Sequence, residues 1–337
     1  MSYTIKDVAK HANVSIATVS RVLNGLSGYS KATEEKVLQA IKELEYQPNA
    51  IARGLISKKS NTVGILFPEV SSQFSAKILR GVEEAVHRLG SSVIVCNTAS
   101  HGQRTMKYLQ LLSEKRVDGI LFVSESITEE FYKTLDSMKI PVVLISTESY
   151  QYPFPFVKVD DKHAAFTATD YLVRMGHSKI GMLGGNKEDL IAGQPRIDGY
   201  KQALAQSGLP INEQSIIHSL GFSFKDGFTG LPKLLEQSSD LTAIFAASDA
   251  LALGAISAAY KLGVKIPDEL SIIGYDNLPI AEMAIPPLTT VAQPLEEMGM
   301  VATEMLFSMM EQGRRVESRI LPHCVIERES VKEIKPI

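Results

Sequence analysis

Residues 4–25 have the sequence TIKDVAKHANVSIATVSRVLNG, and the spacing of their apolar positions predicts two short helices joined by a tight turn. Thr4 is followed three residues later by Asp7, a pattern typical of an N-terminal helix cap. After the turn, the Ser15 hydroxyl can accept hydrogen bonds from the free backbone N–H groups of a second helix. This second helix is expected to run from residue 16 to about residue 24.

The second predicted helix has two distinct arcs. The apolar arc contains Val19, Val22 and Leu23. The opposite arc contains Ala17, Ser20, Arg21 and Asn24. This second arc is short and rich in hydrogen-bond donors, and its arginine can bind a guanine edge or a phosphate. The pattern therefore indicates a helix-turn-helix motif that enters the major groove of DNA.

A third helix completes the predicted unit. Ser30 precedes it, and its buried stripe contains Val37, Ala40, Ile41 and Leu44. Any small helical bundle has such stripes, so they do not decide the function by themselves. The cap, the turn and a close helix contact expected at Ala9 and Ala17 favour DNA binding. Charge supports the same interpretation, because residues 1–60 contain nine Lys or Arg and five Asp or Glu in a chain of net charge −3.

Residues 4–24, together with YQPNAIARGL at 46–55, resemble the lactose-repressor family of bacterial transcription regulators, and the resemblance runs the length of the chain. It implies a hinge that folds into a short helix on DNA and inserts Leu55 into the minor groove. Such an apolar wedge partly unstacks a base step and bends the duplex. Gly54 weakens an isolated helix by about 1 kcal/mol relative to alanine, which favours a hinge ordered only when bound. The alternative is an ordinary solvated linker.

The resemblance also implies DNA contacts for individual residues. Base contacts fall to Ile16, Ala17 and Arg21, and the expected backbone contacts are Ser15, Thr18, Ser20 and Asn24. The remaining expected DNA-binding residues are Thr4, Lys6, Tyr29, Asn49, Ala52, Arg53 and Leu55. Ile16 and Ala17 offer no side-chain hydrogen bonds, so they can only touch thymine methyl groups or permit close approach. Arg21 is therefore expected to carry most of the polar base recognition.

From residue 61 onward, short β-branched runs alternate with amphipathic segments. Strands are expected at 61–67, 93–97, 119–123, 142–146, 156–160, 179–184, 215–220, 243–248 and 270–276. Helices are expected at 73–90, 103–115, 128–138, 161–176, 195–208, 225–238 and 249–263. Such alternation predicts parallel sheets flanked by helices in two α/β lobes. The expected fold is thus multi-domain, with a small all-α helix-turn-helix headpiece and a two-lobed α/β core.

The expected domains are a headpiece at 1–47, a hinge or linker at 48–60 and a core at 61–337. The resemblance implies a core like that of periplasmic sugar-binding proteins, with the chain crossing between lobes near Asp161, Thr290 and Pro322. The two lobes would comprise about 61–160 plus 294–322, and about 161–290 plus 323–332. A small effector would bind between them, since ligands of open sheets sit at the carboxyl ends of the strands.

Motif matching within the family nominates six effector-binding residues, which are Phe74, Arg196, Phe222, Asp249, Asp276 and Gln293, and Glu148 is a seventh candidate. Phe74 and Phe222 can stack on the apolar face of a pyranose ring. Arg196 and Asp276 can bind adjacent hydroxyl groups as fixed donor and acceptor. Plainer interpretations stay open: Phe74 as a core residue, Asp249 as a helix N-cap, and Arg196 and Asp276 as partners of each other.

Several classes of protein are disfavoured. The glycines at 182–186 lack the spacing of a dinucleotide or phosphate loop, and no serine or cysteine stands with a base and an orienting acid. Neither Cys96 nor Cys324 has metal-ligand spacing around it. We therefore expect no enzyme activity, no cofactor and no metal.

The chain has no apolar run of membrane-spanning length and no signal-peptide pattern, so a cytoplasmic location is expected.

These features favour a DNA-binding transcription regulator, most simply a repressor of carbohydrate-metabolism genes, over an exported sugar receptor or an α/β enzyme. The expected partners are operator DNA, a small effector and a second copy of the chain, without a membrane. A sugar or sugar derivative is the first candidate effector, and a purine or other metabolite acting as corepressor is the alternative. The segments 74–90 and 278–287 are the expected dimer surfaces, and residues 330–337 show no leucine heptad of the tetramerising kind.

Overall fold

The computed structural model describes residues 3–23, 25–46, 59–99, 102–313 and 316–334. The chain divides into two compact units, Met1–Asn61 and Thr62–Ile337. Among the described residues, no helix is both long enough and apolar enough to cross a membrane.

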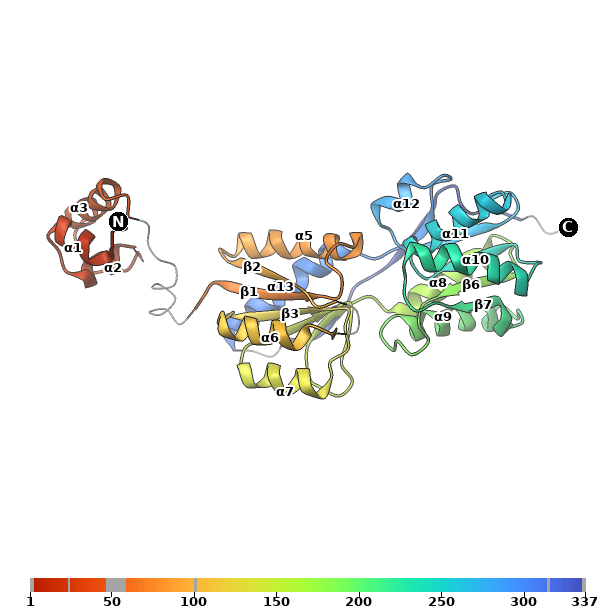
Figure 1. Ribbon diagram of the computed structural model, residues 1–337, viewed down its shortest axis with the longest axis horizontal. Coiled ribbons are helices and arrows are strands. Elements are labelled where there is room, and N and C mark those ends of the chain that lie inside the picture. Colours follow the sequence, from red (N-terminus) through yellow and green to blue (C-terminus); the bar gives the residue numbers. More distant parts are fainter. Residues whose placement is uncertain (1–2, 24, 47–58, 100–101, 314–315, 335–337) are drawn as a thin grey trace. The chain divides into compact units, whose positions relative to one another are not determined.

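The first unit is a three-helix headpiece made of α1 (Ile5–Ala12), α2 (Ile16–Leu23) and α3 (Lys31–Glu43) (Figure 1). Thr4 and Asp7 cap α1 reciprocally, and the Thr4 amide donates to Asp7 Oδ2 over 2.8 Å. The apolar core of the unit contains Val8, Ala9, Ala12, Val19, Val22, Val37 and Ala40. Both stripes predicted for the second and third helices therefore face this core, although their outer members are only partly buried.

The second unit contains two six-stranded sheets. The first sheet has the strand order β11-β5-β4-β3-β1-β2, and its recorded strand pairs are all parallel. The bounds of its strands are β1 (Thr62–Phe67), β2 (Ser92–Asn97), β3 (Gly119–Val123), β4 (Val142–Ile145), β5 (Phe156–Lys158) and β11 (Arg319–Ile320).

Helices cover both faces of this first sheet. They are α5 (Gln73–Arg88), α6 (Thr105–Glu114), α7 (Glu129–Met138) and α13 (Leu295–Gln312). Side chains alternate between faces along a strand, so Ile65 belongs to the cluster under α5 and α13, whereas Leu66 belongs to the cluster under α6 and α7.

The second sheet has the strand order β12-β10-β9-β8-β6-β7. Its strands are β6 (Ile180–Gly184), β7 (Ile216–His218), β8 (Ala243–Ala246), β9 (Ser271–Asp276), β10 (Thr289–Ala292) and β12 (Cys324–Ile326). Its helices are α8 (Asp161–Arg174), α9 (Gly193–Gln206), α10 (Phe224–Gln237), α11 (Asp249–Leu262) and the short α12 (Pro279–Met283). The helix α8 packs on α9, and α10 packs on α11 (Figure 1).

Three segments of the chain connect the two sheets. The strand β5 belongs to the first sheet, and α8 begins the second lobe at Asp161. After β10 of the second sheet, the chain returns to α13, which packs on the first sheet. Finally, β11 pairs in the first sheet and β12 in the second. Residues 159–160, 293–294 and 321–323 therefore form the links between lobes.

The fold class predicted from the sequence is confirmed, and each of the seven predicted core helices starts and ends within two residues of an observed one. The second sheet also has one edge strand that was not predicted, β12, and it runs antiparallel to β10. The chain leaves the second sheet after β10 and re-enters it at β12 through the short link from β11, so β12 runs in the opposite direction to β10. An antiparallel edge strand on a mostly parallel sheet is a common arrangement.

Candidate functional site

The exposed arc of α2 is the first candidate site. Ile16 is 45% exposed, and Ala17 and Arg21 are also exposed, while Val19 and Val22 are buried. Because α2 turns its apolar arc to the headpiece core, the opposite arc faces solvent as predicted. The headpiece therefore presents one short helix face that a DNA groove can receive.

The start of α2 is fixed by Ser15. Its Oγ accepts from the Thr18 amide over 3.0 Å and lies 2.8 Å from Thr18 Oγ1. This is the N-cap predicted from the sequence. The cap sets the direction of the first turn of α2, so it also sets the direction of Ile16 and Ala17.

Arg21 is oriented by the loop that follows α2. Its Nη1 donates to the Ser27 carbonyl oxygen over 3.2 Å. Gly28 has φ +111°, and a Cβ at that position would lie 2.3 Å from Arg21 Nη1. A side chain at 28 would therefore both strain the backbone and displace the guanidinium.

The other predicted DNA-binding residues differ in their exposure, and some lie outside the described residues. Thr4 and Lys6 are exposed, Thr18 and Ser20 are half-buried, and Tyr29 packs partly into the headpiece core. The predicted close helix contact is wrong at Ala17, because that residue is exposed while Ala9 is buried. The remaining predicted residues lie outside the described residues, and they are Asn24, Asn49, Ala52, Arg53 and Leu55.

Arg196 is the centre of a buried polar cluster in the second unit. Its Nε and Nη2 donate to Asp161 Oδ1 over 3.0 and 2.9 Å, and its Nη1 donates to the Ala247 carbonyl over 2.6 Å. Its guanidinium carbon lies 3.9 Å from the centre of the Tyr275 ring and 5.2 Å from that of Phe222. Burial opposes the charge of Arg196, but Tyr275 and Asp161 outweigh burial and hold its pKa above the usual value.

Asp276 and Gln293 form a second buried pair beside this cluster. Gln293 Nε2 donates to Asp276 Oδ1 over 2.7 Å, and each residue is 5% exposed. Burial raises the pKa of Asp276, and the nearby charge of Arg196 opposes that rise. Gln293 Oε1 has no hydrogen-bond partner among the described residues. A buried acceptor left unpaired costs about 1 to 3 kcal/mol, so this oxygen marks a place where a ligand would be stabilised.

Glu148 joins the Arg196 cluster through a lysine. Lys158 Nζ donates to Glu148 Oε1 over 2.8 Å and lies 3.9 Å from Asp161 Oδ2. The Lys158 side chain is only 9% exposed. Alternating charges thus run from Glu148 in the first lobe to Arg196 in the second.

Phe74 and Asp249 have different surroundings. Phe74 is the second residue of α5 and packs against the apolar cluster of the first lobe. Asp249 is fully buried in the second lobe, where Oδ1 accepts from Thr290 Oγ1 over 2.5 Å and Oδ2 accepts from the Leu278 amide over 2.7 Å. Both Asp249 oxygens are therefore occupied, and this carboxyl group ties β10 and the start of α12 to α11.

Two of the plainer sequence interpretations are wrong. The N-cap of α11 is Ser248, whose Oγ accepts from the Leu251 amide, and Asp249 is the first residue of the helix. The ion-pair partner of Arg196 is Asp161, whereas Asp276 accepts from Gln293.

Three members of the cluster were not predicted as site residues, and they are Lys158, Asp161 and Tyr275. Asp161 was noted only as a crossing point. The available signal was the pair of aspartates at 160–161 after a buried strand, since a charged residue at such a position needs a partner. The identity of that partner depends on tertiary contacts 35 residues apart.

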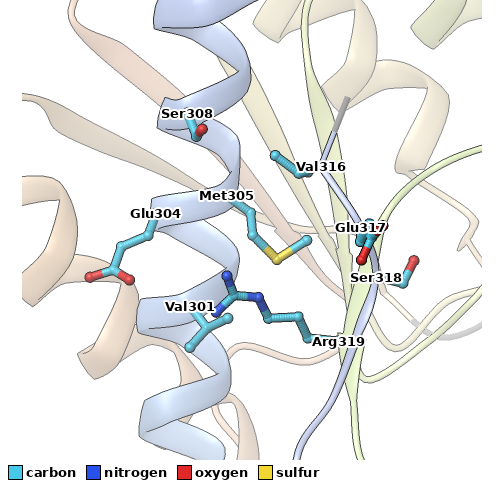
Figure 2. Close-up of a pocket in the computed structure, with 8 residues that line it drawn as sticks. All are labelled: Val301, Glu304, Met305, Ser308, Val316, Glu317, Ser318 and Arg319. Carbon is cyan, nitrogen blue, oxygen red and sulfur yellow. The ribbon is translucent and has the colours of Figure 1, made fainter. Parts of the chain in front are cut away.

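A separate cavity of about 380 Å³ lies beside α13 in the first lobe (Figure 2). It is lined by Val301, Glu304, Met305, Ser308, Val316, Glu317, Ser318 and Arg319. None of the predicted effector residues contributes to it. Within the described part of the chain, no group of three or more His, Cys, Asp or Glu is placed to hold a metal ion.

A helix-turn-helix headpiece joined to a two-lobed α/β core with a buried polar cluster defines a class of protein, the effector-dependent DNA-binding regulators. The model of bacterial regulatory proteins of the lacI family matches residues 4–49. The model of periplasmic binding proteins and the sugar-binding domain of the LacI family matches residues 60–328. The chain belongs to the LacI family, and it is a transcription regulator rather than an enzyme.

Curated relatives and solved structures agree with this assignment. Catabolite control protein A of Priestia megaterium is 39% identical over 98% of this chain and 100% of its own length. A complex of the transcriptional regulator CelR with cellobiose has a TM-score of 0.75 and 30% identity, covering 97% of this chain and 99% of that one. The lac repressor dimer bound to operator and the anti-inducer ONPF has a TM-score of 0.88 and 26% identity, covering 98% and 100%.

Proposed function

We propose that this regulator represses carbohydrate-metabolism genes and that a sugar or sugar derivative, bound by Arg196, Phe222, Asp276 and Gln293, changes its affinity for operator DNA. The observation that carries the proposal is the buried cluster at the links between the lobes. Asp161 begins α8 directly after one link, and Gln293 lies in another. A ligand touching these residues contacts the segments whose geometry sets the arrangement of the lobes.

The chemistry of the cluster suits a polyhydroxyl ring. Phe222 supplies an aromatic face, Gln293 Oε1 supplies an unpaired acceptor, and Asp276 lies next to it. Two relatives of known structure support the same class of ligand, since one was solved with cellobiose and one with ribose. Phe74 and Glu148 are proposed to line the first-lobe side of the same site, whereas Asp249 holds the second lobe together.

On the DNA side, the proposal has two copies of the chain placing α2 in successive major grooves of a near-palindromic operator, with paired Leu55 wedges bending its centre. The lac repressor dimer on operator supports the dimer. Met283 and Ile285, which are 75% and 89% exposed, lie in the expected interface segment 278–287. The protein is proposed to act in the cytoplasm, where its DNA target is.

The coupling between sites follows from linkage. A ligand that prefers one arrangement of the lobes shifts the DNA affinity by the ratio of its affinities for the two arrangements. We propose that the sugar releases the repressor. A purine or other metabolite that tightens operator binding is the alternative.

The test uses full-length protein and a duplex selected by that protein from a randomised pool. Operator affinity is measured by fluorescence anisotropy with and without cellobiose, glucose, ribose, hypoxanthine and guanine. The proposal predicts that one of the sugars weakens operator binding and that the purines do nothing. If a purine tightens binding and no sugar has an effect, the alternative is correct.

A further inference from the structure

The Arg196 guanidinium is neutralised by a side chain of the protein itself. Its Nε and Nη2 both donate to Asp161, which is itself 4% exposed. Tyr275 reinforces the pair, because its hydroxyl donates to Asp161 Oδ1 over 3.2 Å while its ring covers the guanidinium. Three of the five guanidinium N–H groups thus have a recorded acceptor. The positive charge that would bind a phosphate or carboxylate group of a ligand is therefore already paired with Asp161.

The other cations around the cluster are also matched by carboxylates. Lys158 is paired with Glu148 and lies close to Asp161. Lys77 donates to the Asn277 carbonyl, and its charge is among those that oppose the rise that burial causes in the pKa of Asp276. Three cations therefore face the three carboxylates Asp161, Glu148 and Asp276.

Asp249, another carboxyl group near Asp276, adds no negative charge to this balance when it is protonated. Burial, and next the negative charge of Asp276, raise its pKa well above the ordinary value, so its protonated form is favoured. A fourth cation, Arg328, lies near enough to Asp249 to oppose the rise in its pKa, and it donates to the Leu288 carbonyl and to Asn277 Oδ1. Its Nη2 also lies 3.4 Å from Glu282 Oε1, so each of these four cations in the described part of the cluster faces a carboxylate.

The groups with spare capacity are acceptors. Gln293 Oε1 is buried without a partner, and only Oδ1 of Asp276 has a recorded side-chain donor. Because the carboxylate only accepts, the Gln293 amide nitrogen must face it, which leaves the amide oxygen for a ligand. Hydroxyl groups can donate hydrogen bonds to these oxygens. Ionised phosphate and carboxylate groups cannot, because their oxygens only accept hydrogen bonds and carry the same negative charge as Asp276.

We propose that the effector of this regulator is uncharged and rich in hydroxyl groups, and that Asp161 is the residue which excludes sugar phosphates and sugar acids by occupying Arg196. This inference rests on the proposed function, since it names the class of ligand for the same site. Asp161 acts here as a specificity-determining residue. It discriminates because its carboxylate neutralises the Arg196 guanidinium, the cation to which an anionic ligand would bind.

The first test compares matched ligands on the full-length wild-type protein. Thermal unfolding is followed with glucose, glucose 6-phosphate and glucuronate, with ribose and ribose 5-phosphate, and with cellobiose and cellobionate, at constant ionic strength. For any sugar that raises the melting temperature, the anionic derivative is expected to bind about tenfold more weakly or worse. An anionic member that stabilises the protein better than its neutral parent overturns the inference.

The second test removes the neutralising carboxylate with Asp161→Asn. This substitution leaves Arg196 with spare charge, so the melting temperature is expected to rise with inorganic phosphate or with the anionic sugars, which do not stabilise the wild type. The control is Asp170→Asn on the same helix, where the carboxylate forms an exposed pair with Arg174. The control should leave the ligand preference unchanged.

The outcomes separate the inference from the proposed function. If an anionic sugar binds the wild-type cluster and changes operator affinity, the effector function survives and the exclusion of anions is wrong. If no member of either series binds the wild type, the sugar-effector function fails, and the inference fails with it. If Asp161→Asn does not fold, the comparison on the wild type still decides the charge preference.

Discussion

At the scale of single residues, the second lobe shows two aspartates with opposite electrostatic situations. Asp161 faces the cation of Arg196 at hydrogen-bond distance. Asp249 has no cation at such a distance among its recorded partners, which are a hydroxyl and an amide. A buried carboxylate without a counter-ion is costly, so the protonated form is favoured at Asp249.

This difference predicts a pH dependence of stability at Asp249. Its folded-state pKa is raised, first by burial, above the unfolded value near 4. The folded protein therefore binds more protons than the unfolded chain in this range, and the contribution of Asp249 is lost as pH rises through the raised pKa. Asp249→Asn mimics the protonated form. The variant should gain stability relative to the wild type between pH 5 and pH 8, measured by urea unfolding.

The matched control is Asp240→Asn. Asp240 is exposed and its pKa is lowered, first by the hydrogen bond from Lys179. Because Asp240 is charged in both states above pH 5, its substitution should produce a difference that does not change with pH. A difference at Asp249 that is equally flat would refute the assignment of a raised pKa.

A second prediction at this scale concerns Arg21. Arg21→Ala should weaken specific operator binding by about 1 to 3 kcal/mol, because the guanidinium is the proposed polar base-contacting group of the exposed α2 arc. Ile16→Ala should cost much less, since Ile16 offers only an apolar contact. Anisotropy titrations at one salt concentration, with a scrambled duplex as control, measure both. Equal losses would contradict the assignment.

At the scale of elements, spacing was sufficient to predict α2 and its two arcs, because an amphipathic helix repeats on one face. The helix α13 was not predicted. Its buried residues lie on several sides, where it packs against α5 and the first sheet, so its pattern lacks a wide polar face. The partner of Arg196 was not predictable either, since Asp161 is brought to it only by the packing of α8 on α9.

The caps of the headpiece helices provide a matched pair of substitutions. Ser15 caps α2 and Ser30 caps α3, each accepting from the amide three residues later. Ser15→Ala and Ser30→Ala should each destabilise the headpiece by about 1 kcal/mol, as seen by faster amide exchange in the full-length protein. Only Ser15→Ala should also reduce specific DNA affinity beyond this cost, because α2 is the helix proposed to enter the DNA groove. Identical DNA affinities for the two variants would argue against α2 as the groove-binding helix.

At the scale of the whole molecule, the chain passes between two sheets three times, and the links carry or adjoin the buried cluster. The sequence pattern was enough to predict two α/β lobes, because strands and helices alternate regularly. It did not predict which charges neutralise each other, because that depends on side chains from separate links and strands. The observed cluster therefore contains residues that were predicted, such as Arg196, together with residues that were not, such as Asp161.

The proposed dimer gives a prediction for the whole molecule. Sedimentation or light scattering of the full-length protein at micromolar concentration should give twice the chain mass of 36.9 kDa. Met283→Glu combined with Ile285→Glu places charge on the exposed apolar positions of the expected interface and should shift the protein toward monomers. Leu220→Glu, at an exposed apolar residue outside that segment, is the control. Monomeric wild-type protein would contradict the dimer.

The central claim is that the buried cluster and the exposed α2 arc are coupled in one regulator. The direct measurement is the affinity of the active sugar for the full-length protein, determined by calorimetry with and without saturating operator duplex. Linkage requires that the operator change the sugar affinity by the same factor by which the sugar changes the operator affinity. The account predicts equal factors, each between about 5 and 150. A sugar affinity that is identical with and without operator would contradict it.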